Sequence, residues 1–251
     1  MNGTNATLKE SIAFLTDLHV PNHDVQALKV ALNYLRDKDL TMIILSELPE
    51  NESVAFWKHE PKRLKVEIAK NKRMLEVITN NFPNIPDGKK IYIPGNHDER
   101  LSNYILSNAA ALVGIDEIRW EKLMHFSELG WEYCDNKRRM QAGLGPLTIG
   151  KLTILHGHEI KASWGAVNLA KIYYERCKTN VIFGHHHRRQ EWDVKTVHNR
   201  HEGSWMVGCL CDLHPSYMPH NDWVHGFAYI ELYDDGTFHI ENKRIIEGRI
   251  L

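Results

Sequence analysis

Short apolar runs recur along this chain, and each of the first five stops abruptly at polar residues. The runs cover residues 12–15, 42–45, 91–93, 152–155 and 181–183. A short apolar run bounded by polar residues is typical of a strand that is buried on both faces. We therefore expect five buried strands in the first three quarters of the chain.

Amphipathic helices are predicted between the first three of these strands. Apolar residues recur at helical spacing over residues 27–35, and Asp24 precedes them as a helix cap. A second apolar stripe covers residues 64–78, behind Pro61, a residue type that can open a helix. Strand, loop and helix in repetition predict an α/β layer around a largely parallel sheet.

The last part of the chain has a different pattern. Residues 227–233 and 238–245 are strand-like, and Asp235-Gly236 between them predicts an antiparallel hairpin. The sequence has no internal repeat, low-complexity tract or convincing linker. A length of 251 residues fits one large domain or two small ones.

Composition narrows the class of protein. The chain is 43% hydrophobic and 25% charged, which is typical of soluble globular proteins rather than disordered or fibrous ones. Lys and Arg number 31 against 32 Asp and Glu, so no overall field would pull the molecule onto nucleic acid or an anionic membrane. No apolar run approaches membrane-spanning length, and we expect no membrane partner. Nothing in the sequence indicates the oligomeric state.

The cysteines predict reduced thiols. Cys134, Cys177, Cys209 and Cys211 occur in a chain with no apolar leader, which favours a cytoplasmic setting over a disulfide framework. Cys209-x-Cys211 has the wrong spacing for a zinc knuckle and lacks a partner pair, so buried small hydrophobic side chains are expected there.

Candidate metal ligands follow all five predicted strands. The clusters are Asp17-Leu18-His19, Ser46-Glu47, Gly95-Asn96-His97-Asp98, His156-Gly157-His158 and Gly184-His185-His186-His187. One Asp-x-His alone is usually a turn with a capping Asp. Five such clusters at strand ends are hard to explain as independent accidents, because ligand sites of α/β sheets lie at the carboxyl ends of strands. The sequence therefore predicts a metal site at one edge of the sheet.

Four of these clusters resemble the motifs of the calcineurin-like metallophosphoesterases. They match Asp-x-His, Gly-Asn-His-Asp, His-Gly-His and Gly-His-x-His, and they occur in the family order between Ser11 and about Tyr233. The stretches 95–100 and 208–219 further resemble the branch of this family common in phage genomes. The resemblance implies a single domain over 1–251, a four-layer α/β/β/α sandwich whose mixed sheets carry metal-binding loops at strand ends. If the chain is phage-encoded, the cytoplasmic setting that its cysteines favour is the host cytoplasm.

The resemblance also implies a ligand set for two divalent ions. Asp17, His19 and His187 would hold one ion, Asn96, His156 and His185 the other, and Glu47 would bridge them. Imidazole mixed with carboxylate favours Mn²⁺, with Fe, Zn²⁺ or Ni²⁺ as alternatives. The implied activity is hydrolysis of phosphate esters, above all phosphodiesters of nucleotides or nucleic acid, by in-line attack of a hydroxide that bridges the ions.

The second family motif departs from the pattern. Gly-Asp-x-x-Asp aligns with Ser46-Glu47-Leu48-Pro49-Glu50, so Glu47 replaces the bridging Asp and Ser46 the Gly. The extra carbon–carbon bond lengthens the side chain by roughly 1.5 Å. A misplacement of about 1 Å can cost on the order of a hundredfold in rate, whereas carboxylates of either length can bridge metals. The substitution therefore bears on turnover more than on metal binding.

Other residues near the motifs invite roles in catalysis and substrate binding. By the resemblance, His97 would donate a proton to the leaving group or stabilise its charge, and Asp98 would orient the His97 imidazole. Arg100 is a candidate for contact with the substrate phosphate, and His214 and Tyr217 for the substrate wall.

Two readings outside catalysis remain open. The chain could be a weakened family member, with Glu47 in place of Asp, that serves as a binding or assembly module. It could instead bind nucleic acid and carry an incidental metal site.

Overall fold

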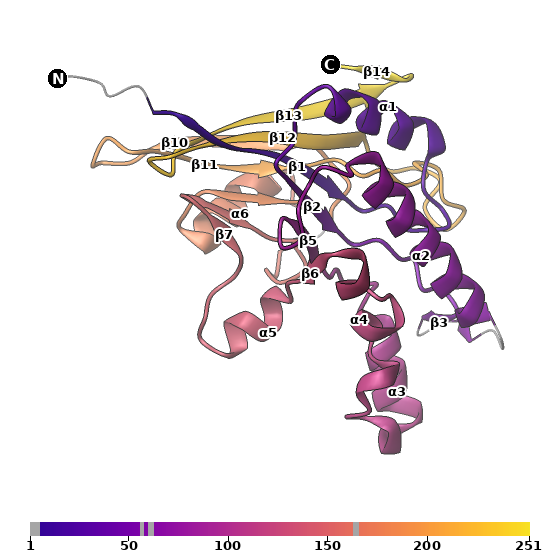
Figure 1. Ribbon diagram of the computed structural model, residues 1–251. Coiled ribbons are helices and arrows are strands. Elements are labelled where there is room, and N and C mark those ends of the chain that lie inside the picture. Colours follow the sequence, from indigo (N-terminus) through magenta and orange to yellow (C-terminus); the bar gives the residue numbers. More distant parts are fainter. Residues whose placement is uncertain (1–5, 56–57, 60–62, 163–165) are drawn as a thin grey trace.

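Two β-sheets face one another at the centre of the chain, and helices cover their outer sides (Figure 1). The computed structural model describes residues 6–55, 58–59, 63–162 and 166–251, with the backbone alone at 58–59. Within these residues, no helix is both long and apolar enough to cross a membrane.

The larger sheet has seven strands in the order β14-β13-β12-β1-β2-β5-β6. Four of them run parallel: β1 (Leu8–Thr16), β2 (Met42–Ser46), β5 (Lys90–Ile93) and β6 (Trp131–Tyr133). Three continue the sheet in antiparallel pairs: β12 (His225–Tyr233), β13 (Phe238–Ile246) and β14 (Arg249–Ile250). The sheet is therefore mixed, with β1 at the change of direction.

The smaller sheet has five strands in the order β10-β11-β9-β8-β7. Its parallel centre consists of β8 (Leu152–Ile154), β9 (Val181–Phe183) and β11 (His201–Met206). The antiparallel edges are β7 (Thr148–Ile149) and β10 (Gln190–Lys195). A separate short pair joins β3 (Val54–Ala55) to β4 (Lys58–His59).

The helices fall into three groups. Two long helices, α1 (Val25–Arg36) and α2 (Arg63–Asn81), lie on the outer side of the larger sheet, and α6 (Leu169–Cys177) covers the smaller one. Shorter helices link the two halves of the chain: α3 (Arg100–Asn108), α4 (Trp120–Leu123) and α5 (Asn136–Gln141). Three single-turn helices follow α3 and α4: η1 (Ala110–Leu112), η2 (Asp116–Ile118) and η3 (Ser127–Leu129).

Three apolar clusters hold these layers together. Along β1, Ala13 and Leu15 pack in the cluster beneath α1 and α2, whereas Ile12 and Phe14 pack in the cluster between the two sheets. This alternation follows from the period of two along a strand. A third cluster packs α6 on the smaller sheet through Tyr173. Burial on both faces explains why these strands are continuous apolar runs.

The predicted elements are confirmed, and so is the four-layer α/β/β/α sandwich. The five apolar runs correspond to β1, β2, β5, β8 and β9. Asp24 caps α1, because its Oδ1 accepts a hydrogen bond from the Ala27 backbone N–H at 2.7 Å. The hairpin of β12 and β13 turns through Gly236, at a φ of 79°. The predicted role of Pro61 falls outside the described residues.

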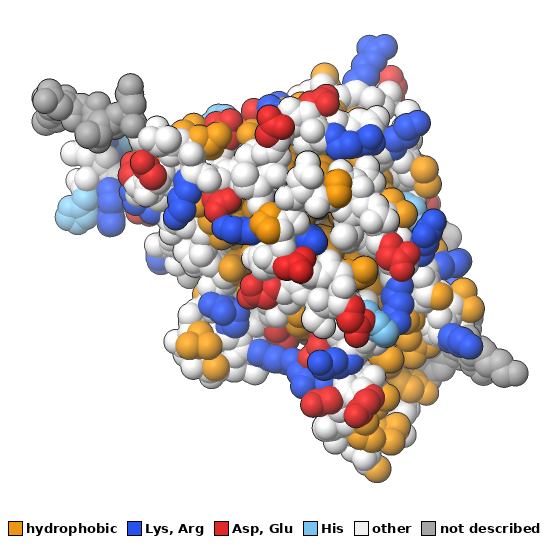
Figure 2. All heavy atoms as spheres, in the orientation of Figure 1, with side chains coloured by type: hydrophobic (Ala, Val, Ile, Leu, Met, Phe, Trp, Pro, Cys, Tyr) orange, Lys and Arg blue, Asp and Glu red, His pale blue; other side chains and the backbone are white. Residues whose placement is uncertain are grey.

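The surface carries both signs of charge. Figure 2 shows basic and acidic side chains intermixed over the visible face, in keeping with the net charge of −1. Hydrophobic side chains gather at the lower tip, over the protruding α3 region (Figures 1 and 2). Exposed apolar residues of that region include Leu106 and Val113.

The packing between the sheets predicts the cost of a cavity there. We expect Phe14→Ala, in the inter-sheet cluster, to lower the free energy of unfolding by about 3–5 kcal/mol, because a fully buried ring is lost. Urea denaturation measures this. Leu8→Ala, on the exposed start of the same strand, is the matched control and should change stability by less than about 0.5 kcal/mol. Equal effects of the two substitutions would contradict the packing of the sheets.

Candidate metal centre

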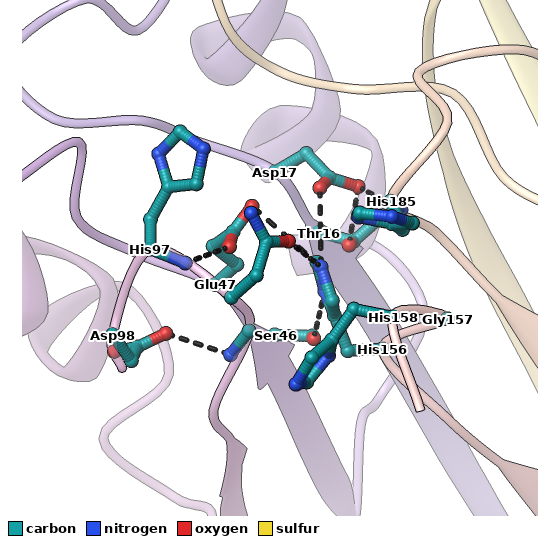
Figure 3. A network of polar contacts seen from close by, with 12 residues as sticks. Thr16, Asp17, Ser46, Glu47, His97, Asp98, His156, Gly157, His158 and His185 are labelled. Carbon is teal, nitrogen blue, oxygen red and sulfur yellow. Dashed lines mark hydrogen bonds and ion pairs between the residues drawn. The ribbon is translucent and has the colours of Figure 1, made fainter. Parts of the chain in front are cut away.

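The five ligand clusters meet at one place, where the carboxyl ends of β1, β2, β5, β8 and β9 come together (Figure 3). Backbone hydrogen bonds join their loops. The Asp17 N–H donates to the Ser46 carbonyl at 3.0 Å, and the Glu47 N–H donates to the Ile93 carbonyl at 3.2 Å. In the smaller sheet, the Gly184 N–H donates to the His156 carbonyl at 2.8 Å. The sheets thus fix the loops relative to one another.

Five residues of these loops have left-handed backbone conformations. The φ angles lie between 51° and 68° at Asp17, His19, Glu47, His185 and His187. Such a conformation costs of order 1–3 kcal/mol for a residue with a side chain, and it concentrates at functional sites. Here it turns each loop sharply at the end of its strand, so that side chains that follow three strands point back to one centre.

Two glycines of the motifs are required by close packing around the carboxylates. A Cβ on Gly95 would lie 2.3 Å from Oε1 of Glu47, and a Cβ on Gly184 would lie 2.4 Å from Oδ2 of Asp17. Both distances are far below van der Waals contact. The missing side chain of Gly95 therefore leaves the space that the long Glu47 side chain occupies.

The three residues of the first predicted ligand set face one another and the predicted bridge, Glu47. The Nε2 atoms of His19 and His187 lie 3.1 Å apart, Nε2 of His187 lies 3.5 Å from Oδ1 of Asp17, and Nε2 of His19 lies 3.3 Å from Oε2 of Glu47. Ligand atoms about 2.0–2.2 Å from one ion are separated by roughly 3–3.5 Å. The observed separations fit a common ion.

The second predicted set lies beside the first. Nε2 of His156 is 3.3 Å from Oδ1 of Asn96 and 3.7 Å from Oε2 of Glu47. The ring of His185 packs against His156 with centroids 5.1 Å apart. The same Oε2 atom of Glu47 also faces His19 of the first set, so this oxygen lies between the two predicted sets.

One buried oxygen has the surroundings of a cation ligand. Oδ2 of Asp17 accepts hydrogen bonds from Oγ1 of Thr16 at 2.7 Å and from the His185 N–H at 2.9 Å. Oδ1 of Asp17 is buried and accepts none. A buried carboxylate oxygen without a donor is costly, so a metal ion at this oxygen would satisfy it.

The charges of the centre lead to the same conclusion. Burial opposes ionisation of Asp17, but the neighbouring His187 and His156 hold its pKa well below its ordinary value. Burial and repulsion by Asp17 and Asp98 raise the pKa of Glu47 well above its ordinary value. Without a cation, two buried carboxylates compete at one place, and a divalent ion would remove the conflict.

The imidazoles are in the form that binds metals. Burial is the main cause that lowers the pKa of His156 and His187, and it lowers the pKa of His185 to about 2. Neutral imidazole has a lone pair for a metal ion, whereas the protonated ring has none. Among the described residues, three groups could hold a metal ion: Asp17 with His19 and Glu47, His19 with His187 and Cys211, and His19 with Glu50 and His97. The residues present therefore fit divalent metals.

Two residues that were not predicted as metal ligands hold the predicted ligands in place. Oε2 of Glu50 lies 2.9 Å from Nδ1 of His19, and Oγ of Ser46 lies 3.0 Å from Nδ1 of His156. Such partners fix the tautomer and direction of metal-binding imidazoles. Ser46 and Glu50 both belong to the stretch 46–50, which departs from the family's second motif. The sequence signal for Glu50 was its place as the second acidic residue of that stretch. Ser46 contributes a hydroxyl that glycine would lack.

The structure corrects the role of Asp98. Its Oδ1 accepts a hydrogen bond from the Tyr92 hydroxyl at 2.6 Å, and its Oδ2 accepts one from the Gly95 N–H at 2.7 Å. Burial raises the pKa of Asp98 to about 7. The carboxylate points away from the His97 ring (Figure 3), so Asp98 shapes the loop and does not orient the imidazole.

Glu50 and Arg100 hold His97 instead. Nδ1 of His97 lies 3.5 Å from Oε2 of Glu50, and Nε2 of His97 accepts a hydrogen bond from Nη2 of Arg100 at 2.9 Å. Arg100 also donates to Oε1 of Glu50 at 3.0 Å. Burial is the main cause that lowers the pKa of His97 to about 3. The three side chains form one network at the edge of the centre.

A cavity of about 600 Å³ opens over the metal centre. Its lining includes His19, Asn96, His187 and Arg100. Tyr217 also lines the cavity, together with Trp223, which sequence reasoning missed.

Two other predictions have clear outcomes. His214 is exposed and absent from the cavity lining, because its loop turns there and the His214 N–H donates to Oδ1 of Asp212. The four cysteines are free, and Cys209 and Cys211 are buried, as predicted. Sγ of Cys211 lies 3.8 Å from Nδ1 of His187.

Comparisons with known proteins find likeness in structure alone. No protein-family model matches this sequence, and no curated protein does. A double mutant of Vps29 from Entamoeba histolytica is similar with a TM-score of 0.47 at 13% identity, over 96% of each chain. Vacuolar Protein Sorting 29 from Cryptosporidium parvum gives a TM-score of 0.46 at 11% identity, over 98% of this chain and 96% of that chain. These values describe a partial likeness in chain path and transfer no activity to this chain.

The contact between Glu50 and His19 predicts an effect on metal binding. We expect Glu50→Gln to weaken Mn²⁺ binding roughly 10- to 100-fold, because the amide is a poorer partner for the imidazole N–H. Isothermal titration calorimetry measures the affinity. Glu52→Gln is the matched control, since Glu52 is on the same loop and pairs with Arg63 at 2.8 Å. Unchanged affinity in Glu50→Gln would remove Glu50 from the support of the centre.

The buried His186 predicts a pH effect in the metal-free protein. Nε2 of His186 faces the Tyr173 hydroxyl at 3.0 Å, and burial, with Arg188, lowers its pKa to about 4. Below pH 6.5, His186 binds a proton in the unfolded chain but not in the folded protein. The free energy of unfolding therefore decreases as the pH is lowered towards about 4. In EDTA, His186→Gln should reduce the loss between pH 6.5 and 5 by about 1–2 kcal/mol.

Urea denaturation at the two pH values checks the effect of His186. His239→Gln is the control, because His239 is exposed on β13 and remains in water in both states. Identical pH dependence in wild type and His186→Gln would show that the folded protein does not exclude this proton.

Proposed function

We propose that this chain is a dinuclear-metal-dependent phosphoesterase, with phosphodiesters of nucleotides or nucleic acid as its substrates. The observation that carries the proposal is the convergence of ligand atoms from four strands around an Asp17 oxygen that is buried without a donor. The two ligand sets stay those of the sequence prediction, and Glu47 bridges them. The proposal includes residues 1–251 as one domain.

Mn²⁺ is the proposed metal, with Fe, Zn²⁺ and Ni²⁺ as alternatives. The donor set consists of imidazole nitrogens with carboxylate and amide oxygens, a mixture that suits these ions better than Mg²⁺ or Ca²⁺. Membership of the phage branch and a cytoplasmic location remain predictions from the sequence.

Two bound divalent ions would clamp phosphate oxygens and lower the pKa of a shared water. The protein residues would do the rest. Oε1 of Glu47 accepts a hydrogen bond from the His97 N–H at 2.8 Å, so the same carboxylate that faces both ligand sets also anchors the loop of His97. That bond holds the leaving-group side of the site at a constant distance from the ligands.

His97 is the proposed group on the leaving-group side. In the structure its Nε2 accepts a hydrogen bond from Arg100, so this nitrogen has no proton to donate. Donation to a leaving oxygen therefore requires the substrate to displace Arg100 and Nε2 of His97 to take up a proton from water before it gives that proton to the leaving oxygen. Arg100 is released at the same moment, and its guanidinium can then pair with the phosphate.

The charge of the cavity makes phosphate binding depend on the metal ions. Glu47, Glu50 and Glu52 line the cavity, and Arg100 is the one Lys or Arg among the described residues of its lining. These carboxylates repel a phosphate anion unless cations offset their charge. Phosphate binding should then require the metal ions.

A binding or assembly module is the second candidate. It is favoured by the hydrogen bond that Arg100 donates to Nε2 of His97, which leaves this nitrogen without a proton. It is also favoured by Glu47 in place of the bridging Asp of the family. In this reading the metals bind, and turnover is weak.

A hydrolysis assay separates the two. Protein loaded with Mn²⁺ should cleave bis-p-nitrophenyl phosphate faster than p-nitrophenyl phosphate, and Asp17→Ala or EDTA should abolish cleavage. His97→Ala should lower turnover roughly 10²–10⁴-fold while metal content stays constant. His239→Ala, far from the ligands on β13, is the control.

Metal analysis of the same samples decides between the candidates. Bound metal without turnover, together with recovery of turnover in Glu47→Asp, would support the binding module. Absence of bound metal in the wild type would overturn both readings.

A further inference from the structure

We propose that Trp223 and Tyr217 form a stacking wall for a nucleobase, so that the substrate is the phosphate ester of a nucleoside. The inference rests on the proposed phosphoesterase and names its substrate class. We call these two side chains the aromatic wall. Both line the cavity over the metal centre, and both line a second cavity of about 310 Å³ next to it.

The aromatic wall is held against a metal ligand. The Trp223 ring lies with its centroid 4.2 Å from that of His187, at an interplanar angle of 73°. The Val224 N–H donates to the His187 carbonyl at 2.8 Å, so the backbone next to Trp223 is tied to the same residue. The Tyr217 ring lies 6.4 Å from that of Trp223 at 64°. Trp223 therefore occupies a defined place beside the proposed metals.

The loop that carries the wall is braced from within. Nδ2 of Asn221 donates to the carbonyls of Leu213 and Met218, each at 2.9 Å, and Oδ1 of Asn221 accepts from the Trp223 N–H at 3.0 Å. One amide thus joins both ends of the loop. A braced loop loses little freedom when a ligand stacks on it, which favours binding.

The exposure of the wall fits a stacking role. Tyr217 is 69% exposed and Trp223 half-buried, although both are large rings. Exposed aromatic rings next to a phosphate site are the means by which proteins hold bases, since every base has a π-face. A nucleoside phosphate carries its base one sugar away from the phosphorus, and Trp223 packs directly against the ligand His187.

The cavity has the size for such a ligand. About 600 Å³ over the metals lies within the range of sites that enclose small organic molecules. Next to Tyr217 in the chain, Ser216 and Met218 also line this cavity, and they offer little to distinguish one base from another. We therefore expect stacking with weak base preference.

Calorimetry tests the wall without catalysis. Protein loaded with Mn²⁺ is titrated with thymidine 5′-monophosphate and with deoxyribose 5-phosphate, which lacks the base. The nucleotide should bind about tenfold or more tightly, and Trp223→Ala should remove that difference. Trp223→Phe should retain most of it. Trp192→Ala, on β10 beneath Lys171, is the matched control and should behave as the wild type.

A kinetic comparison locates the effect on the substrate. Trp223→Ala should lower kcat/KM about tenfold or more for the p-nitrophenyl ester of thymidine 5′-monophosphate and leave methyl p-nitrophenyl phosphate within about twofold. Equal binding of nucleotide and sugar phosphate by the wild type would overturn the stacking wall, even if both esters are hydrolysed. If no ester is hydrolysed, the proposed function fails, and calorimetry still decides the wall.

A last arm separates two sources of the nucleoside phosphate. A free dinucleotide and a single-stranded oligonucleotide present the same base and diester, and the wall accepts both chemistries. Tight binding of either ligand that is lost in Trp223→Ala supports the wall. The wall is overturned if Trp223→Ala binds both ligands as tightly as the wild type does.

Discussion

Two buried carboxylates placed next to each other are the constraint on which the centre depends. Asp17 and Glu47 are both almost fully buried, and burial, with the charge of Asp17, raises the pKa of Glu47. Burial also lowers the pKa of the neighbouring His156 and His187 imidazoles, so these rings have lone pairs to offer a metal ion. The arrangement would destabilise an ordinary protein core, but it suits the binding of cations. It also costs conformational free energy, because five of its residues have a left-handed backbone.

The packing of the two sheets offsets this cost, because it fixes strand ends on both sides of the centre. The larger sheet supplies the loops after β1, β2 and β5, and the smaller sheet supplies those after β8 and β9. The apolar cluster between the sheets holds the two groups of loops at constant separation. A shift between the sheets would therefore separate His156 from Glu47, although neither residue contributes to the core.

The departing second motif is adjusted as a unit. Glu47 is longer than the family residue, and Gly95 leaves it space. Ser46 gives His156 a partner, and Glu50 gives one to His19, with Arg100 and His97 attached to the same carboxylate. The side chains of Ser46, Glu50, Arg100 and His97 thus contact the two imidazoles or one another in a network beside Glu47.

By itself, the sequence determined the layers, the strands and the ligand types, because these follow from local patterns. Continuous apolar runs indicate strands buried on both faces, and the residues directly after them must lie at strand ends. The sequence did not predict which side chains those residues contact. His19 meets Glu50 and His187, which are 31 and 168 positions away, and Asp98 turns from His97 to Tyr92. Trp223 reaches the centre from a loop without a motif. Only the tertiary structure decides such contacts, since they depend on how separate loops pack in space.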